Sequence, residues 1–69
     1  MIPLTTTRNA AIVAARDFNK VGGDQATALV LAFQKYDDWQ DLIALAPDSD
    51  RNRDQEYRIF EVAFVAALQ

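Results

Sequence analysis

Near its C-terminus the chain reads IFEVAFVAAL over residues 59–68, with Glu61 as the only polar residue. As a helix this segment is apolar nearly all the way round, and such a helix has to be covered on more than one side. A chain of 69 residues has little further protein with which to cover it, because small domains bury a low fraction of their surface. We therefore expect a second copy of the chain, or another protein, to cover part of this segment.

The composition predicts one small folded domain that spans residues 1–69. Hydrophobic residues make up 51% of the chain and charged residues 25%, which is typical of globular and not of disordered sequences. The chain has no Cys and no His, so disulfides and the usual zinc ligands are both excluded. Small domains commonly need a disulfide, a bound metal or a partner to be stable. Oligomerisation is therefore the expected source of the additional stability. We expect no metal and no cofactor.

The net charge of −3 argues against a protein that grips a nucleic-acid backbone, which needs a basic surface. No apolar stretch reaches the ~18 residues of a membrane span. Arg8 precedes a short apolar run, but Asn9 and Pro3 make it a poor signal peptide. The sequence thus predicts a cytoplasmic protein with neither a nucleic-acid nor a membrane partner.

Three helical segments are predicted, and the first runs from about Thr6 to Lys20. Residues at helical spacing form its apolar face: Ala11, Ala14, Ala15, Phe18 and Val21. The many alanines make this a slim helix that can approach a neighbour closely. Gly22 and Gly23 end it, because glycine adopts the left-handed C-terminal conformation without a steric cost.

The second helix is predicted to begin after Asp24, a suitable N-cap, and to run to about Ala46, where Pro47 stops it. It is the longest of the three, at about 33 Å for a rise of 1.5 Å per residue. Its main apolar stripe consists of Leu29, Ala32, Phe33, Tyr36, Trp39, Ile43 and Ala46. Tyr36 and Trp39 lie on this stripe, so a place in the core is favoured for both, although large aromatics also serve as interface anchors.

The third helix is predicted to start near Ser49 or Asp50 and to reach the C-terminus. Residues 57–62 are β-branched and aromatic enough to form a strand, but Ala63, Ala66 and Ala67 favour a helix. One apolar stripe should face the core: Tyr57, Phe60, Ala63, Phe64 and Ala67. A second set lies around its side and back: Ile59, Val62, Val65 and Ala66.

Two surfaces are therefore candidates for contact with other molecules. The side and back of the third helix predict a homodimer contact, because a monomer rarely leaves a large apolar patch in water. On the second helix, a ridge that mixes leucines with charges predicts a partner-binding surface: Leu31, Lys35, Asp38, Leu42 and Leu45. The alternative is that these leucines are ordinary exposed residues, which are common on protein surfaces.

Catalysis is not expected, because the nucleophile–base pairs that enzymes use most often need His or Cys. Asp37, Asp38 and Asp41 cluster on the second helix, and a solvated acidic face explains them. Residues 48–54 resemble the opening of a calcium loop, but Arg53 stands where that loop needs Gly and Ile59 where it needs Glu. Helix capping by Asp48, Ser49 and Asp50 accounts better for this segment.

A small dimeric DNA-binding regulator or antitoxin is the alternative from another functional class. Arg51, Arg53 and Arg58 cluster near the start of the third helix, but a recognition helix exposes polar residues along one face. The third helix becomes apolar within two turns, and its arginines alternate with Asp54 and Glu56. We expect these arginines to pair with acidic residues on the second helix or on a partner.

In its length and in a helical layout that spans residues 6–68, the chain resembles small phage-encoded proteins that disable host regulators, and in particular the phage quorum-sensing anti-activator. The resemblance rests on no shared motif, so no functional residue is carried over. It implies a protein that binds a LuxR-type transcriptional activator in the bacterial host cell and blocks its DNA binding. A pilus-assembly ATPase is a second host target that the resemblance implies.

The sequence thus predicts an all-α protein, a helical hairpin with a short first helix that assembles as a homodimeric helical bundle. Its expected function is to bind and inhibit a host regulatory protein without catalysis.

Overall fold

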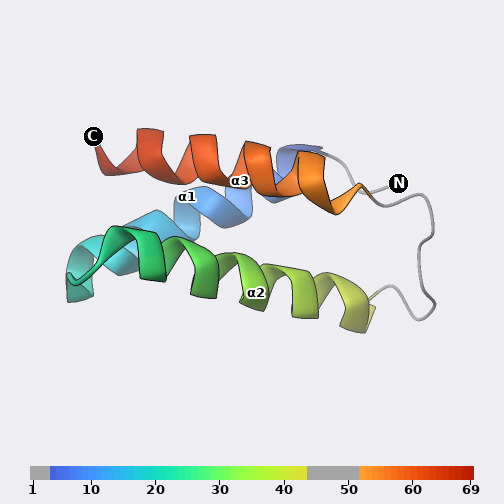
Figure 1. The fold of residues 1–69 in the computed structure, drawn as a ribbon, viewed down its shortest axis with the longest axis horizontal. Coiled ribbons are helices and arrows are strands. Elements are labelled where there is room, and N and C mark those ends of the chain that lie inside the picture. Colours follow the sequence, from blue (N-terminus) through green and yellow to red (C-terminus); the bar gives the residue numbers. More distant parts are fainter. Residues whose placement is uncertain (1–3, 44–51) are drawn as a thin grey trace.

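Three α-helices make up the part of the chain that the computed structural model describes, residues 4–43 and 52–69 (Figure 1). They are α1 (Leu4–Val21), α2 (Gln25–Ile43) and α3 (Arg53–Leu68). α1 and α3 run in the same direction and α2 runs back between them in the chain order. The described residues contain no strand, so the helical prediction for the C-terminal segment is confirmed.

The turn between α1 and α2 follows the predicted punctuation. Gly22 and Gly23 have φ angles of 77° and 114°, and the Gly22 amide donates to the Phe18 carbonyl at 2.7 Å. The Asp24 carboxylate then caps α2, since its Oδ2 accepts from the Thr27 hydroxyl at 2.6 Å and from the Thr27 amide at 3.3 Å. These contacts fix where one helix ends and the next begins.

The start of α3 differs from the prediction. The helix begins at Arg53, and Asn52 is its N-cap, with the side-chain oxygen accepting from the Gln55 amide at 3.1 Å. The predicted starting residues Ser49 and Asp50, and Asp48 with them, lie outside the described part. Ala46 and Pro47, the predicted end of α2, lie outside it as well.

The first helix is not the short one. α1 has 18 residues and α3 has 16, because α1 already begins at Leu4, ahead of the threonines that the sequence offered as caps. The described residues therefore form three helices of similar length, and a hairpin with a short extra helix is not an accurate description of them.

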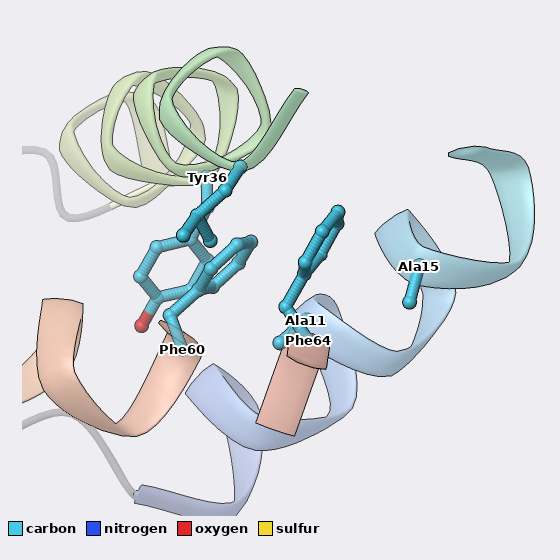
Figure 2. Close-up of a cluster of buried hydrophobic side chains, with 6 residues drawn as sticks. Ala11, Ala15, Tyr36, Phe60 and Phe64 are labelled. Atoms are coloured by element: carbon cyan, nitrogen blue, oxygen red, sulfur yellow. The ribbon is translucent and has the colours of Figure 1, made fainter. Parts of the chain in front are cut away.

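The core lies between all three helices, but α1 packs mainly against α3, and α2 contacts both less closely. Two alanines of α1, Ala11 and Ala15, and two rings of α3, Phe60 and Phe64, are fully buried, and Tyr36 reaches them from α2 (Figure 2). The slim face of α1 explains this pairing, because alanines let the backbone of α1 approach the large rings of α3. The predicted core stripes of α1 and α3 are thus largely confirmed.

Aromatic contacts join α2 to α3. Phe33 meets Phe60 and Tyr57 edge to face, with ring centroids 5.4 Å and 5.0 Å apart, which is a favourable geometry for aromatic pairs. On α1, Phe18 contacts the Phe64 ring at 6.0 Å. These rings fill the space that the alanines of α1 leave open, and the stripe predicted for α2 faces the core at Leu29, Phe33 and Tyr36. The side chains of Ile43 and Ala46 are not among those that the structure describes.

Candidate functional site

A groove of about 480 Å³ runs between α1 and α2. The residues that line its α1 wall and its α2 wall recur at helical spacing, and the rings of Phe60 and Phe64 form its floor. The residues that line its walls are Ala10, Val13, Ala14, Asp17, Phe18, Val21 and Gly22 on one side, and Ala28, Leu31, Ala32, Lys35, Tyr36 and Trp39 on the other.

Small side chains open the groove. Alanines at positions 10 and 14 of α1 and at positions 28 and 32 of α2 leave the two helices without bulky residues along the middle of their facing walls. Because α2 packs less closely on α1 than α3 does, this space remains accessible from outside.

Large apolar side chains line the groove yet remain exposed. Val13 is 56% exposed, Leu31 is 54% exposed and Trp39 is 48% exposed. The prediction that Trp39 belongs to the core is therefore wrong. Tyr36 and Gln40 occupy the inward side of that helical turn, and Trp39 is displaced from them towards the groove, where its ring contacts Tyr36 at a centroid distance of 6.4 Å.

The prediction that Val21 belongs to the core face of α1 is wrong as well. Val21 is 86% exposed and lines the groove, whereas Ala11 and Ala15 of that face are buried. At 100° per residue, position 21 lies at the edge of the face that α3 covers, and Val21 therefore lies on the groove side of α1.

The groove carries one charge of each sign on its two walls. Asp17 lies on α1 and Lys35 lies on α2, and both side chains are exposed. Its remaining lining is almost entirely apolar, which is typical of sites that bind the apolar face of a helix.

The predicted partner-binding residues divide into two groups. Leu31 and Lys35 line the groove, together with Trp39, which sequence reasoning had placed elsewhere. Asp38 and Leu42 are exposed on the same helix but do not line the groove, and Leu42 is 79% exposed. Leu45 lies outside the described residues.

The predicted dimer contact lies on the outer side of α3. Val62 is 63% exposed and Ala66 is exposed, while Ile59 and Val65 are half-buried. A second depression, of about 750 Å³, is lined by three of these residues, Val62, Val65 and Ala66, where the C-terminal half of α3 faces the start of α2. Its lining includes two acidic residues, Asp24 and Glu61, and no basic one.

A buried polar network joins the three helices. The Tyr36 hydroxyl of α2 lies 2.6 Å from Thr7 Oγ1 of α1 and donates to Glu56 Oε1 of α3 at 3.2 Å. Because the phenol has only one proton, Thr7 donates to the Tyr36 oxygen. All three side chains are at most 4% exposed. Sequence reasoning missed Thr7 and Glu56, since each looks like an ordinary helix-end residue when the neighbouring helices are unknown.

The acidic residues of α2 have a basic neighbour. The Arg53 guanidinium lies 3.2 Å from Asp37 and 3.3 Å from Asp41, which ties the start of α3 to the last turns of α2. The expected pairing of the arginines with acids on the second helix is thus confirmed for Arg53, while Arg51 lies outside the described residues.

Neither a metal cluster nor a membrane-spanning helix is found in the described ranges 4–43 and 52–69. These residues hold no group of three or more acidic, His or Cys side chains with which to bind an ion. None of their helices combines the length and hydropathy needed to cross a bilayer. Comparison of the chain with protein-family models, curated proteins and solved structures finds no match.

Proposed function

We propose that this protein is a non-enzymatic binding protein that holds one helix of a regulatory partner in the groove between α1 and α2 and thereby inhibits that partner. The observation that supports this function most is the exposure of Val13, Leu31 and Trp39 along one continuous groove. Contiguous exposed apolar surface with a polar rim marks interaction sites in soluble proteins.

The shape of the groove favours a helix as the bound element. Two neighbouring helices present two walls of side chains, and a further helix can pack against both of them, as in a four-helix bundle. The bound helix would carry large apolar residues at helical spacing, which fill the space over the alanines at positions 14 and 32. Trp39 would act as an anchor, because tryptophan is enriched among residues that dominate binding energy.

The resemblance to phage proteins that disable host regulators suggests which partner to test first. A LuxR-type quorum-sensing activator is the first candidate, and a pilus-assembly ATPase is the second. Inhibition follows if the captured helix is one that the activator needs for DNA binding.

The structure gives the DNA-binding alternative less support. Arg53, one of the three arginines on which that alternative depends, contacts Asp37 and Asp41. The two carboxylates offset part of the positive charge of this guanidinium, which weakens its attraction for a phosphate.

The test is a gel-shift assay with a purified LuxR-type activator on its DNA site. We expect the wild-type protein to release the DNA as its concentration rises, and we expect Leu31→Asp to release it at least tenfold less effectively, because the new carboxylate places a charge in the groove. Val30→Asp is the matched control, since Val30 is 45% exposed on the same helix and does not line the groove.

Equal potency of Leu31→Asp and Val30→Asp would exclude the groove as the binding site. Direct retardation of DNA by this protein alone, with an affinity that falls steeply as the salt concentration rises, would favour the DNA-binding alternative.

A further inference from the structure

We propose that in the free protein the groove between α1 and α2 is occupied by the same groove face of a second copy, related by a two-fold axis, so that α1 and α2 of both copies pack as a four-helix bundle. The charge register of the groove, its shape and a comparison with the outer face of α3 support this pairing.

The charges on the groove walls are self-complementary. α1 and α2 are antiparallel neighbours joined by a three-residue turn, Gly22 to Asp24. Asp17 lies five residues before Gly22 and Lys35 lies eleven residues after Asp24. The two charged residues therefore occupy different levels of the groove, about 9 Å apart at 1.5 Å per residue.

A two-fold axis midway between these levels exchanges them. Lys35 of one copy then lies level with Asp17 of the other, and the reverse contact forms at the same time. A two-fold interface always makes each contact twice, so one Asp and one Lys on this face suffice for two ion pairs. Opposite charges arranged in this way fix the register of an interface.

The shape of the groove has the same symmetry. Trp39, the largest side chain on the walls, lies at one end of the groove, and Gly22 and Ala28 lie at the other end beside the exposed Val21. The two-fold operation places Trp39 of each copy over the small residues of its partner. The central alanines, at positions 14 and 32, leave the space that close approach of the helices requires.

The outer face of α3, from which the sequence predicts a dimer through Ile59, Val62, Val65 and Ala66, carries the exposed Arg58 one turn before Val62, but the depression beside it lacks the charge balance of the groove. The depression beside it has Asp24 and Glu61 on its lining and no basic residue. Two copies that met over this depression would bring like charges together, which costs free energy. The groove is therefore the better self-association surface.

The consequence for binding, which rests on the proposed function, is competition. A partner helix and a second copy would need the same groove, so the protein would bind its partner as a monomer released from the dimer. Higher protein concentration would then increase the dimer fraction and lower the apparent affinity for the partner.

Sedimentation equilibrium with reciprocal charge variants tests the self-pairing. We expect the wild-type mass to rise towards twice 7.7 kDa with concentration. Lys35→Asp and Asp17→Lys should each raise the dimer dissociation constant roughly tenfold or more, because each places like charges together twice. The double variant, Asp17→Lys with Lys35→Asp, should restore the wild-type constant, since the pairs reform with the charges exchanged.

Both charged residues are exposed, so these substitutions are expected to leave the fold intact, and circular dichroism checks this. Val62→Asp is the comparison variant on α3 and should dimerise like the wild type. The pairing is refuted if the wild type remains monomeric at about 1 mM, a concentration that detects even very weak dimers. It is also refuted if Val62→Asp dissociates the dimer while the charge variants do not. Neither result bears on the gel-shift assay, so failure of the self-pairing is distinguishable from failure of the proposed function.

Discussion

Tyr36 is the residue that links all three helices through one side chain. Its ring packs on Phe60, at a centroid distance of 5.7 Å, and its hydroxyl contacts Thr7 and Glu56. Removal of this hydroxyl leaves a buried threonine and a buried carboxylate without one of their hydrogen bonds. Unsatisfied buried polar groups are costly, so this position should be far more sensitive than its chemistry alone suggests.

We predict that Tyr36→Phe lowers the free energy of unfolding by about 1–3 kcal/mol, a range typical of buried groups that lose a partner. Urea denaturation followed by circular dichroism measures the change. Tyr57→Phe is the matched control, because the Tyr57 ring is only half-buried and contacts Phe33 through its edge geometry. If both variants lose the same stability, the network contributes nothing beyond ordinary ring packing.

Asp24 gives the fold a defined acid dependence. The hydrogen bond from the Thr27 hydroxyl, helped by that from the Thr27 amide, holds the pKa of the Asp24 carboxyl below its ordinary value of 3.8. A carboxyl whose folded pKa is lowered stabilises the protein above its unfolded pKa. This stabilisation is lost as the pH falls through the lowered, folded pKa.

We therefore predict that Asp24→Ala melts at a lower temperature than the wild type at pH 7, since α2 loses its N-cap. The difference in melting temperature should shrink as the pH falls below 3.8 and on through the lower pKa of the folded state, where the carboxyl of the folded wild type becomes protonated. Melting curves at a series of pH values measure it. A difference that stays constant into strong acid would show that the charge on Asp24 is irrelevant to the cap.

Trp39 is a residue that helical spacing alone assigns to the wrong side of its helix. Helical spacing places residues 36, 39 and 40 on neighbouring sides of α2, and hydrophobicity alone assigns the tryptophan to the core. In the structure Gln40 is 5% exposed and Trp39 is 48% exposed. Which of two adjacent sides is covered depends on where α1 and α3 lie, and the sequence of α2 does not contain that information.

At the level of the helices, the close packing of α1 on α3 depends on small residues. Ala11 and Ala15 are fully buried against the large rings of α3, so neither position has room for a longer side chain. Figure 2 shows the two alanines on successive turns of α1.

We predict that Ala15→Leu destabilises the protein by about 1–3 kcal/mol, which is typical of an overpacked core. Ala26→Leu is the matched control, because Ala26 is exposed on α2, and it should change stability little. Chemical denaturation of the two variants side by side provides the test. Equal stability of both variants would mean that α1 does not pack closely on α3.

The ion pair of Arg53 with Asp37 and Asp41 is expected to be the weaker link between elements. Arg53 is 58% exposed and Asp41 is 56% exposed, so solvent screens most of their attraction. We predict that Arg53→Ala costs no more than about 1 kcal/mol, and that added salt reduces even this loss. A loss as large as that of Tyr36→Phe, unchanged by salt, would contradict this ranking.

The sequence predicted the elements better than their arrangement. Gly22, Gly23 and Asp24 fixed the first turn because their backbone and capping chemistry is local. The start of α3 was predicted too early, since several residues before Asn52 had equal capping potential. The arrangement of α1 against α3 was not predicted, because it depends on contacts between residues almost 50 positions apart.

For the molecule as a whole, the consequence is a three-helix arrangement in which α3 covers one side of α1 and α2 packs more loosely (Figure 1). The groove between α1 and α2 therefore remains available. Sequence reasoning found Leu31 and Lys35 on this surface by their position off the main stripe. It missed the α1 wall, because Val13 and Val21 acquire their role only once α2 lies beside them.

Occupation of this groove by another helix surface is reported directly by Trp39, because it is the only tryptophan in the chain. The measurement is the fluorescence emission spectrum of the wild type across the concentration range in which its mass is determined. We predict that the emission maximum moves to shorter wavelength as the mass doubles, since Trp39 leaves water, and that Lys35→Asp shows no such shift. A mass that doubles while the emission of Trp39 stays unchanged would contradict the claim, because the copies would then meet on a face other than the groove.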